Sequence, residues 1–249
     1  MKVDVIVPAH NPGVFLKEAL NSCMAQTYRD FNIIVIDDAS TEDVGSIVKK
    51  YRKALYLRLD ENRGPAAARN YGVKFGQGDL VSFLDADDLW EPKKLEWSVK
   101  AFQRDLSVGM TCGNYRRLEN RERLCNPFYR RPQVITWERL IKTNLVASGS
   151  VTMRRDVFEH LGGFDENLWI GEDWKLWLSC AQEYEIKYIH KVLYKYSVIK
   201  SGNSLTNRDA LQNKHKKLLK NMIKESTERM DEINRLGRAE NSSHKNLLT

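Results

Sequence analysis

The chain has 249 residues, of which 42% are hydrophobic and 29% are charged, a composition that is typical of a globular protein and excludes an intrinsically disordered one. No apolar run approaches the roughly 18–20 residues of a membrane-spanning helix. The first residues lead directly into a strand-like run, so we expect no secretory signal. The length predicts one domain with a small appendage.

The net charge of +7 is concentrated in two segments. Residues 207–249 contain ten Lys or Arg against six Asp or Glu, and residues 116–131 contain six Arg against two Glu. Such a surface can face an anionic partner, namely nucleic acid, acidic lipid or a phosphorylated substrate, or it can simply be solvated. The four cysteines show neither a CxxC pair nor zinc-binding spacing, so we expect reduced thiols and a cytoplasmic protein.

Residues 3–102 alternate between short apolar runs and stretches with helical spacing. The predicted strands are Val3–Val7, Asn32–Ile36, Leu55–Leu59 and Leu80–Leu84. The predicted helices are the stretch that contains Leu16, Leu20 and Met24, then Val44–Arg52, Ala66–Phe75 and Pro92–Phe102. This alternation predicts an α/β fold with a Rossmann-like, mostly parallel sheet and helices on both faces. In such sheets, ligands bind at the carboxyl ends of the strands.

The second half of the sequence is less regular. The predicted strands are Val108–Asn114, Gly149–Met153, Ile186–Ile189 and Leu193–Ile199, and the predicted helices are Thr136–Lys142, Asp156–Leu161 and Glu172–Glu183. A stripe of Leu, Met and Ile predicts one long C-terminal helix from Arg208 to Leu236, with a frayed end beyond Gly237. We therefore divide the chain into a main domain with two halves and a basic C-terminal extension, namely 1–206 (1–115 and 116–206) and 207–249.

Polar residues follow three of the predicted strands: Pro8-Ala9-His10-Asn11, Asp37-Asp38 and Asp85-Ala86-Asp87-Asp88. In an extended chain, Asp85 and Asp87 would point the same way, and converging carboxylates need a cation or a donor between them. Oxygen ligands of this kind suit Mg²⁺ or Mn²⁺ completed by substrate phosphates. The alternative is an Asp-rich turn that caps the following helix.

Two further acidic pairs allow a functional and a structural interpretation. Asp37-Asp38 could accept hydrogen bonds from a base or a ribose hydroxyl, or could cap the following helix. Glu172-Asp173 begins a predicted helix, where the helix dipole favours acids. Carboxylates beside aromatic rings also suit sugar binding or a general base. The neighbouring tryptophans are Trp169, Trp174 and Trp177, and core packing would explain the last of these equally well.

Several stretches together resemble a known family. In chain order they are VDVIVPAHN, QTYRDFNIIVIDDAS, NRGPAAARN, LVSFLDADDLWEPKKLE, GGFDE and GEDWKLWL. The chain resembles the family-2 inverting glycosyltransferases with a GT-A fold, in a match that runs from Val3 to Thr206. The resemblance implies transfer of a sugar, with inversion, from a nucleotide-sugar donor, usually a UDP-sugar, to an acceptor hydroxyl.

The resemblance also implies roles for individual residues. The nucleotide-binding residues would be Pro8, Ala9, Asp37, Asp38, Arg69, Asp85 and Asp87. The ligands of a divalent metal, Mn²⁺ or Mg²⁺, would be Asp87 and Asp88. Asp173 would be the catalytic base, and the acceptor sugar would contact the residues around it, namely Glu172, Trp174 and Trp169.

The sequence departs from the family pattern in two places. Relatives often carry a His in the segment that corresponds to Tyr194–Thr206, where this chain has none and Lys200 or Ser204 could substitute. The QxxRW motif of processive members is also missing, which predicts one sugar per encounter. We expect a bacterial-type enzyme of O-antigen, capsule or lipopolysaccharide synthesis, whose acceptor is a glycan or a lipid-diphosphate-linked glycan.

Two other functions would each explain a part of the sequence. A sugar-nucleotide nucleotidyltransferase would need a Gly-rich loop with Arg and Lys after the first strand, which His10-Asn11-Pro12-Gly13 does not provide. Charge alone suggests a nucleic-acid-binding domain, but stacking aromatics and a reading motif are missing, so we expect no nucleic-acid partner. The basic tail could hold the enzyme on the inner face of an anionic membrane, at about 1 kcal/mol per Lys or Arg. It could instead pack on the domain or form a homodimer through the C-terminal helix.

Overall fold

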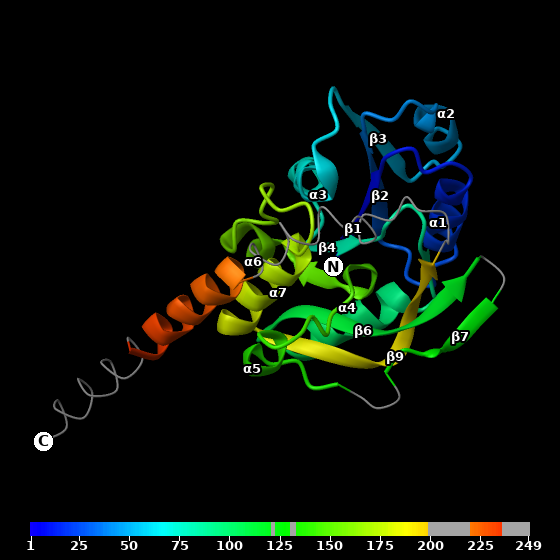
Figure 1. Cartoon of the computed structure of the whole chain (residues 1–249). Helices are drawn as coiled ribbons and strands as arrows, with labels where there is room; N and C mark the ends of the chain where they lie inside the picture. Colours follow the sequence, from blue (N-terminus) through cyan, green and yellow to red (C-terminus); the bar gives the residue numbers. More distant parts are fainter. Residues whose placement is uncertain (121–122, 130–132, 199–219, 236–249) are drawn as a thin grey trace, which may run out of the picture. The chain divides into compact units, whose positions relative to one another are not determined.

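The computed structural model describes residues 1–120, 123–129, 133–198 and 220–235 (Figure 1). The chain divides between Leu205 and Thr206 into two units, which are described separately. In the second unit, residues 220–235 are helical, in agreement with the long helix predicted there. The rest of that helix, the predicted frayed end, Lys200 and Ser204 lie outside the described residues. None of the helices described is long and apolar enough to cross a membrane.

The described part of the first unit contains one nine-stranded sheet. Eight strands follow the order β3-β2-β1-β4-β8-β6-β9-β5, and the ninth, β7, pairs with β6. Its strands are β1 (Val3–Ala9), β2 (Phe31–Asp38), β3 (Ala54–Leu59), β4 (Leu80–Phe83), β5 (Leu89–Trp90), β6 (Val108–Glu119), β7 (Arg123–Pro127), β8 (Thr152–Arg154) and β9 (Glu185–Val198). Strands β1 to β4 are parallel, as predicted, and the register places Pro8 beside Ile36 and Ala9 beside Asp37. The predicted polar strand ends therefore lie at one edge of the sheet.

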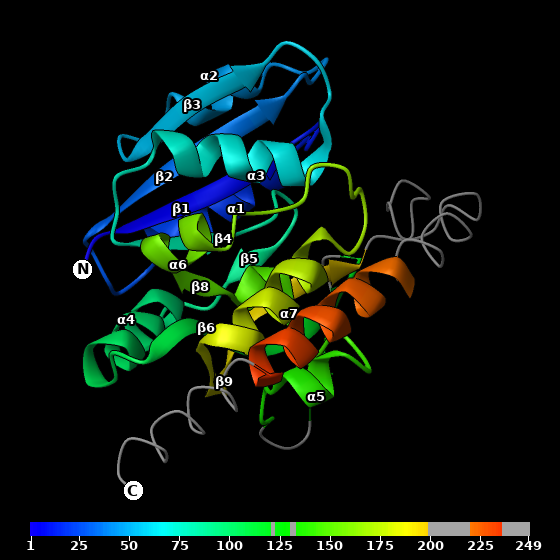
Figure 2. The ribbon, with the colours of Figure 1, turned by 90° about the vertical axis from the view of Figure 1, so that its left-hand side faces the viewer.

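Helices cover both faces of this sheet, as the alternation of strands and helices predicted (Figure 2). The helices are α1 (Phe15–Met24), α2 (Val44–Val48), α3 (Gly64–Phe75), α4 (Lys94–Arg104), α5 (Trp137–Leu140), α6 (Arg155–His160) and α7 (Glu172–Glu183), with a 3₁₀ turn η1 at Ser148–Ser150. Val5 and Val7 of β1 belong to the same buried cluster as Leu16 of α1. On the other face, Gly72 of α3 lies so close to the sheet that an added Cβ would be 2.4 Å from Ile36 Cδ1.

Strand β9 differs from the prediction. The two expected strands, Ile186–Ile189 and Leu193–Ile199, form one continuous strand parallel to β6 over its described length. Its register passes from Gly113 beside Ile189 to Asn114 beside Val192, so the polar residues between them form a bulge. The polar residues that interrupt the hydrophobic pattern, and that suggested two separate strands, lie in this bulge. Strands β5 and β7 were not predicted at all.

Candidate active site

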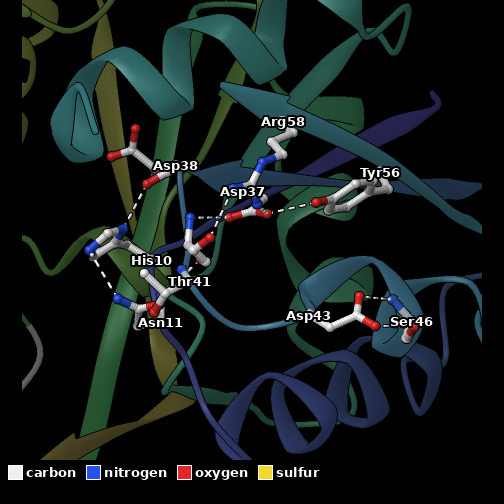
Figure 3. Close-up of polar contacts among 10 residues, drawn as sticks. His10, Asn11, Asp37, Asp38, Thr41, Asp43, Ser46, Tyr56 and Arg58 are labelled. Atoms are coloured by element: carbon white, nitrogen blue, oxygen red, sulfur yellow. Dashed lines mark hydrogen bonds and ion pairs between the residues drawn. The ribbon is translucent and has the colours of Figure 1, made fainter. Parts of the chain in front are cut away.

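Asp37 lies buried beneath the loop that follows β2 (Figure 3). Its Oδ1 accepts the backbone N–H of Ser40 at 2.8 Å, and its Oδ2 accepts the Tyr56 hydroxyl at 2.6 Å and the Arg58 guanidinium. Burial acts to raise the pKa of Asp37, but these hydrogen bonds outweigh it and hold the pKa below its ordinary value. Asp37 is thus an ionised anchor for this loop, and its predicted contact with a nucleotide stays a prediction.

Asp38 connects the end of β2 to the beginning of α3. Its two carboxylate oxygens accept the backbone N–H groups of Arg63 and Gly64, each at 2.8 Å. These donors lie at the helix N-terminus, where backbone N–H groups have no partner within the helix. The alternative prediction, that Asp37-Asp38 caps the next helix, is wrong, because Asp43 caps α2 and accepts the Ser46 N–H at 3.0 Å.

The loops after β1 and β2 are tied together by side-chain hydrogen bonds (Figure 3). Asn11 donates its backbone N–H to Ser40 Oγ at 2.9 Å and accepts the Thr41 N–H on Oδ1 at 2.8 Å. His10 Nδ1 donates to the Asp38 carbonyl at 2.7 Å. His10 Nε2 is then the acceptor for Asn11 Nδ2 at 3.3 Å. These polar groups lie at the carboxyl ends of β1 and β2, where the resemblance places the nucleotide.

The segment after β4 is a turn, because Asp88 donates its N–H to the Asp85 carbonyl at 3.0 Å. The expectation that Asp85 and Asp87 share one side of an extended chain is therefore wrong. Asp88 is buried and accepts the Ser197 N–H of β9 at 2.7 Å, while the Ser197 hydroxyl donates to the Asp87 carbonyl. The predicted helix-capping role is also wrong, because Lys93 is the N-cap of α4 and the Leu95 N–H in its first turn is accepted by the Gln26 side chain at 3.0 Å.

The turn offers only oxygen donors to a metal ion. In the part of the chain that the structure describes, no group of three or more His, Cys, Asp or Glu side chains is placed to hold a metal. Asp87 and Asp88 would therefore need further ligands, which diphosphate oxygens and water provide for Mg²⁺ and Mn²⁺. A carboxylate set with half-buried Asp87 fits these hard cations rather than zinc.

Arg69 on α3 joins two acidic segments. It is only 4% exposed, and its two terminal nitrogens lie 2.7 Å from Asp85 Oδ1 and 2.8 Å from Glu172 Oε1. Burial alone would lower the pKa of Arg69, but the charges of these two carboxylates raise it. The guanidinium thus connects the turn after β4 to the first turn of α7.

Glu172 is 7% exposed and lies against Arg69 rather than on an open surface. Burial, followed by the charge of Asp173, raises the pKa of Glu172 to about 7 despite the attraction of Arg69. This arrangement favours a role in positioning Arg69. The contact with an acceptor sugar stays a prediction.

We expect Glu172→Gln to weaken the pH dependence of stability between about pH 4.5 and pH 7. The pKa of Glu172 is higher in the folded protein than its ordinary value of 4.5, so between these limits the folded state retains a proton that the unfolded chain releases. The stability that this proton contributes is complete below pH 4.5 and is lost as the pH rises through 7. Urea unfolding at pH 5 and pH 8 measures the difference, with the exposed Glu166→Gln as control. An unchanged pH slope in Glu172→Gln would contradict this assignment.

Asp173 is half-buried beside Glu172, in the first turn of α7. Its Oδ2 accepts the Ser148 hydroxyl and its Oδ1 accepts the Trp174 N–H, both at 2.6 Å. Burial raises the pKa of Asp173, and the Ser148 hydrogen bond and the charge of Arg69 offset only part of this effect. A fixed carboxylate with a raised pKa has the properties of a general base.

The three tryptophans near this helix have different surroundings. Trp169 is 44% exposed, and its ring lies over Gly64 at the beginning of α3, 3.4 Å from where a Cβ would stand. Trp174 is half-buried and donates its Nε1–H to the Leu140 carbonyl at 2.8 Å. Trp177 is fully buried and packs edge-to-face against Phe164, so the core-packing interpretation is confirmed for it.

The family model for glycosyl transferase family 2 matches residues 4–162, and the chain belongs to this family. An uncharacterised glycosyltransferase of Rickettsia felis is 34% identical over 215 residues, which cover 84% of this chain and 34% of the relative. Another, from Methanocaldococcus jannaschii, is 26% identical over 215 residues, covering 82% of this chain and 73% of the relative. The chain thus spans about a third of the length of the Rickettsia relative.

Solved structures confirm the predicted GT-A fold. S. aureus TarS 1–349 in complex with UDP has a TM-score of 0.68 and 26% identity, covering 80% of this chain and 61% of that one. The same protein in complex with UDP-GlcNAc has a TM-score of 0.71 and 25% identity, covering 84% and 61%. The mannosyltransferase PcManGT from Pyrobaculum calidifontis, in complex with GDP-Man and Mn²⁺, has a TM-score of 0.67 and 26% identity, covering 81% and 58%.

Proposed function

We propose that this glycosyltransferase transfers one sugar, with inversion, from a nucleotide-sugar donor to a hydroxyl of a glycan or lipid-diphosphate-linked glycan. One observation carries the proposal: Arg69 joins the acidic turn at Asp85 to the first turn of α7, which contains Asp173. The acids that we assign to the donor and the carboxylate that we assign as the base would thereby belong to one cluster. The UDP and UDP-GlcNAc complexes of TarS support a UDP-sugar as the donor.

On the donor side, the ends of β1 and β2 would hold the nucleotide. Asp37 fixes the loop after β2 from below, so that Asp38 and the backbone of Pro8 and Ala9 would contact the base. Arg69 and Asp85 would lie toward the ribose and the diphosphate. In this assignment, residues 1–115 form the donor half and residues 116–206 the acceptor half.

On the acceptor side, Asp173 would remove the proton from the attacking hydroxyl. The acceptor oxygen then forms a bond to the anomeric carbon from the face opposite the diphosphate, which departs with the electron pair of the broken C–O bond. The configuration is inverted in one step, through a transition state that resembles an oxocarbenium ion. Ser148 and the Trp174 N–H hold the two oxygens of Asp173 in place for this task.

Asp87, with Asp88 beside it, would hold the divalent cation. When bound, Mn²⁺ or Mg²⁺ neutralises the charge that develops on the leaving diphosphate. The complex of PcManGT with GDP-Man and Mn²⁺ supports this cofactor. Ser197 of β9 fixes this turn in two ways, because its hydroxyl donates to the Asp87 carbonyl and its N–H donates to Asp88 Oδ1.

Calorimetry of UDP and GDP, each with and without Mn²⁺, tests the donor site. We expect Mn²⁺ to strengthen UDP binding, and Asp87→Ala to weaken the Mn²⁺-dependent binding by about tenfold or more. The exposed Asp60→Ala, on the loop after β3, is the matched control and should bind as the parent does. Mn²⁺-dependent binding of GDP instead of UDP would keep the mechanism and change the donor. Binding of neither nucleotide by the folded protein would contradict the proposal.

The family resemblance and the basic segments together support a cellular setting. We propose surface-polysaccharide synthesis, such as O-antigen or capsule, at the cytoplasmic face of a membrane. The basic segments 116–131 and 207–249 support an anionic lipid surface as the place where the acceptor is met. Sedimentation with liposomes containing anionic lipid tests this, and salt-insensitive or absent binding would contradict it. A homodimer through the C-terminal helix is the alternative role, which the oligomeric state in solution would reveal.

A further inference from the structure

A row of aromatic side chains in mutual contact runs from the core to the surface, on β6, β9 and the segment that follows β7. Tyr115 is its centre: its ring stacks on Phe128 with 4.7 Å between centroids and 14° between planes. It also contacts Tyr194 at 5.4 Å and Tyr196 at 6.0 Å. Tyr194 is buried, whereas Phe128 is 51% exposed and Tyr196 is 38% exposed. The row therefore presents two large apolar side chains to solvent on a rigid base.

Phe128 is fixed in place although half of it is exposed. Its backbone N–H donates to the Tyr115 carbonyl at 2.8 Å. The side chain of Asn114 holds the next residue from both sides, accepting the Tyr129 N–H at 3.0 Å and donating to the Tyr129 carbonyl at 2.7 Å. An aromatic ring that is ordered before binding loses little conformational entropy when a ligand covers it.

The buried end of the row lies next to the proposed base. The Tyr194 ring packs on Gly149 so closely that an added Cβ would be 2.7 Å from it. The residue before this glycine, Ser148, donates its hydroxyl to Asp173 at 2.6 Å. The aromatic row is thereby connected to the proposed base through Gly149 and Ser148.

The exposed end of the row lies next to the acidic turn. Tyr196 is followed in β9 by Ser197, whose N–H donates to Asp88 at 2.7 Å. Burial, and then the negative charges of Asp88, Asp85 and Asp87, raise the pKa of Tyr196 to about 12. The row thus extends between the two groups of acids, on β6, β9 and the segment that follows β7.

We propose that the exposed faces of Phe128 and Tyr196 bind a pyranose ring of the acceptor glycan, an inference that rests on the proposed function. One face of a pyranose carries mainly C–H bonds, and this apolar face complements the flat face of an aromatic ring. Its hydroxyls remain at the edge of the ring, where polar donors are needed. Arg117, 46% exposed and beside Tyr196 in the register of β6 and β9, supplies such donors.

Saturation-transfer NMR with the full chain tests this site, with the methyl glycosides of glucose, galactose, mannose and N-acetylglucosamine as probes. We expect transfer to the C–H protons of at least one glycoside. Phe128→Ala should raise its dissociation constant about two- to tenfold, and Phe128→Trp should retain binding. The matched control is Phe75→Ala on α3, where the native ring is 47% exposed and which should bind as the parent does.

Several results would overturn the inference: no glycoside binding by the parent, unchanged binding by Phe128→Ala, or an equal loss in Phe75→Ala. A loss of UDP affinity in Phe128→Ala without a loss of glycoside affinity would assign the row to a nucleobase and would also overturn it. UDP calorimetry separates this inference from the proposed function. A protein that binds glycosides through Phe128 but binds no nucleotide would contradict the donor assignment alone.

Discussion

Replacing Asp173 with Asn is expected to reduce turnover by about 10²- to 10⁴-fold, the usual contribution of a general base, while UDP binding stays unchanged. Asn has nearly the same size and keeps one acceptor oxygen, which can accept the Ser148 hydroxyl, while the bond from the Trp174 N–H is lost. What is lost is the carboxylate that accepts the proton of the acceptor hydroxyl. Release of UDP from a UDP-sugar in the presence of acceptor measures turnover, and calorimetry measures UDP binding.

The pH profile adds a second test of Asp173. Its pKa lies above the ordinary value, and only the ionised form can act as a base. The parent enzyme should therefore lose activity as the pH falls through this pKa, and the residual activity of Asp173→Asn should lack that limb. The pH profile of activity reports on Glu172 and Asp173 together, because the two neighbouring carboxyl groups titrate as a pair.

Asp156→Asn is the matched control for Asp173→Asn. Asp156 is also an acid in the first turn of a helix, α6, and its Oδ1 accepts the N–H of the next residue at 2.9 Å. The control therefore makes the same change at the same kind of helix position, outside the candidate site. Turnover of Asp173→Asn that equals that of Asp156→Asn would contradict the assignment of the base.

The sequence was sufficient to predict the parallel half of the fold and the place of the acids. The runs that became β1 to β4 are mainly apolar, with single polar residues such as Asp4 and Ser82 inside them, a pattern that favours cover on both faces. Because parallel strands align their carboxyl ends, Asp37, Asp38 and Asp85 could be placed at one edge from their positions alone.

The partners of those acids could not be predicted from the sequence. Ser148 contacts Asp173 across 25 positions, and Arg69 contacts Glu172 across 103. Such pairs depend on how distant elements pack, and one sequence contains no periodic signal for them. The same holds for the contact between Asp88 and Ser197 of β9, which lie 109 positions apart.

The replacement of Arg69 by Met is expected to lower the free energy of unfolding by about 3–5 kcal/mol at pH 8, the cost of breaking a buried ion pair from one side. Arg69 is 4% exposed and Glu172 is 7% exposed, so the change leaves a buried carboxylate without its cation. The loss should be smaller at pH 5, because Glu172 can then bind a proton and become neutral. Urea unfolding at the two pH values measures both effects.

Arg63→Met makes the same substitution in an exposed pair and serves as the control. Arg63 lies 2.8 Å from Glu166, with side chains 49% and 40% exposed, so its loss should cost no more than about 1 kcal/mol. The double variant Arg69→Met with Glu172→Gln should regain part of the lost stability, because the buried charge is removed with its partner. Equal losses in Arg69→Met and Arg63→Met, or the same loss at both pH values, would show that Arg69 does not stabilise Glu172. Arg69 would then not hold the acidic turn and the first turn of α7 together. This result would contradict the proposed function, which rests on that single cluster.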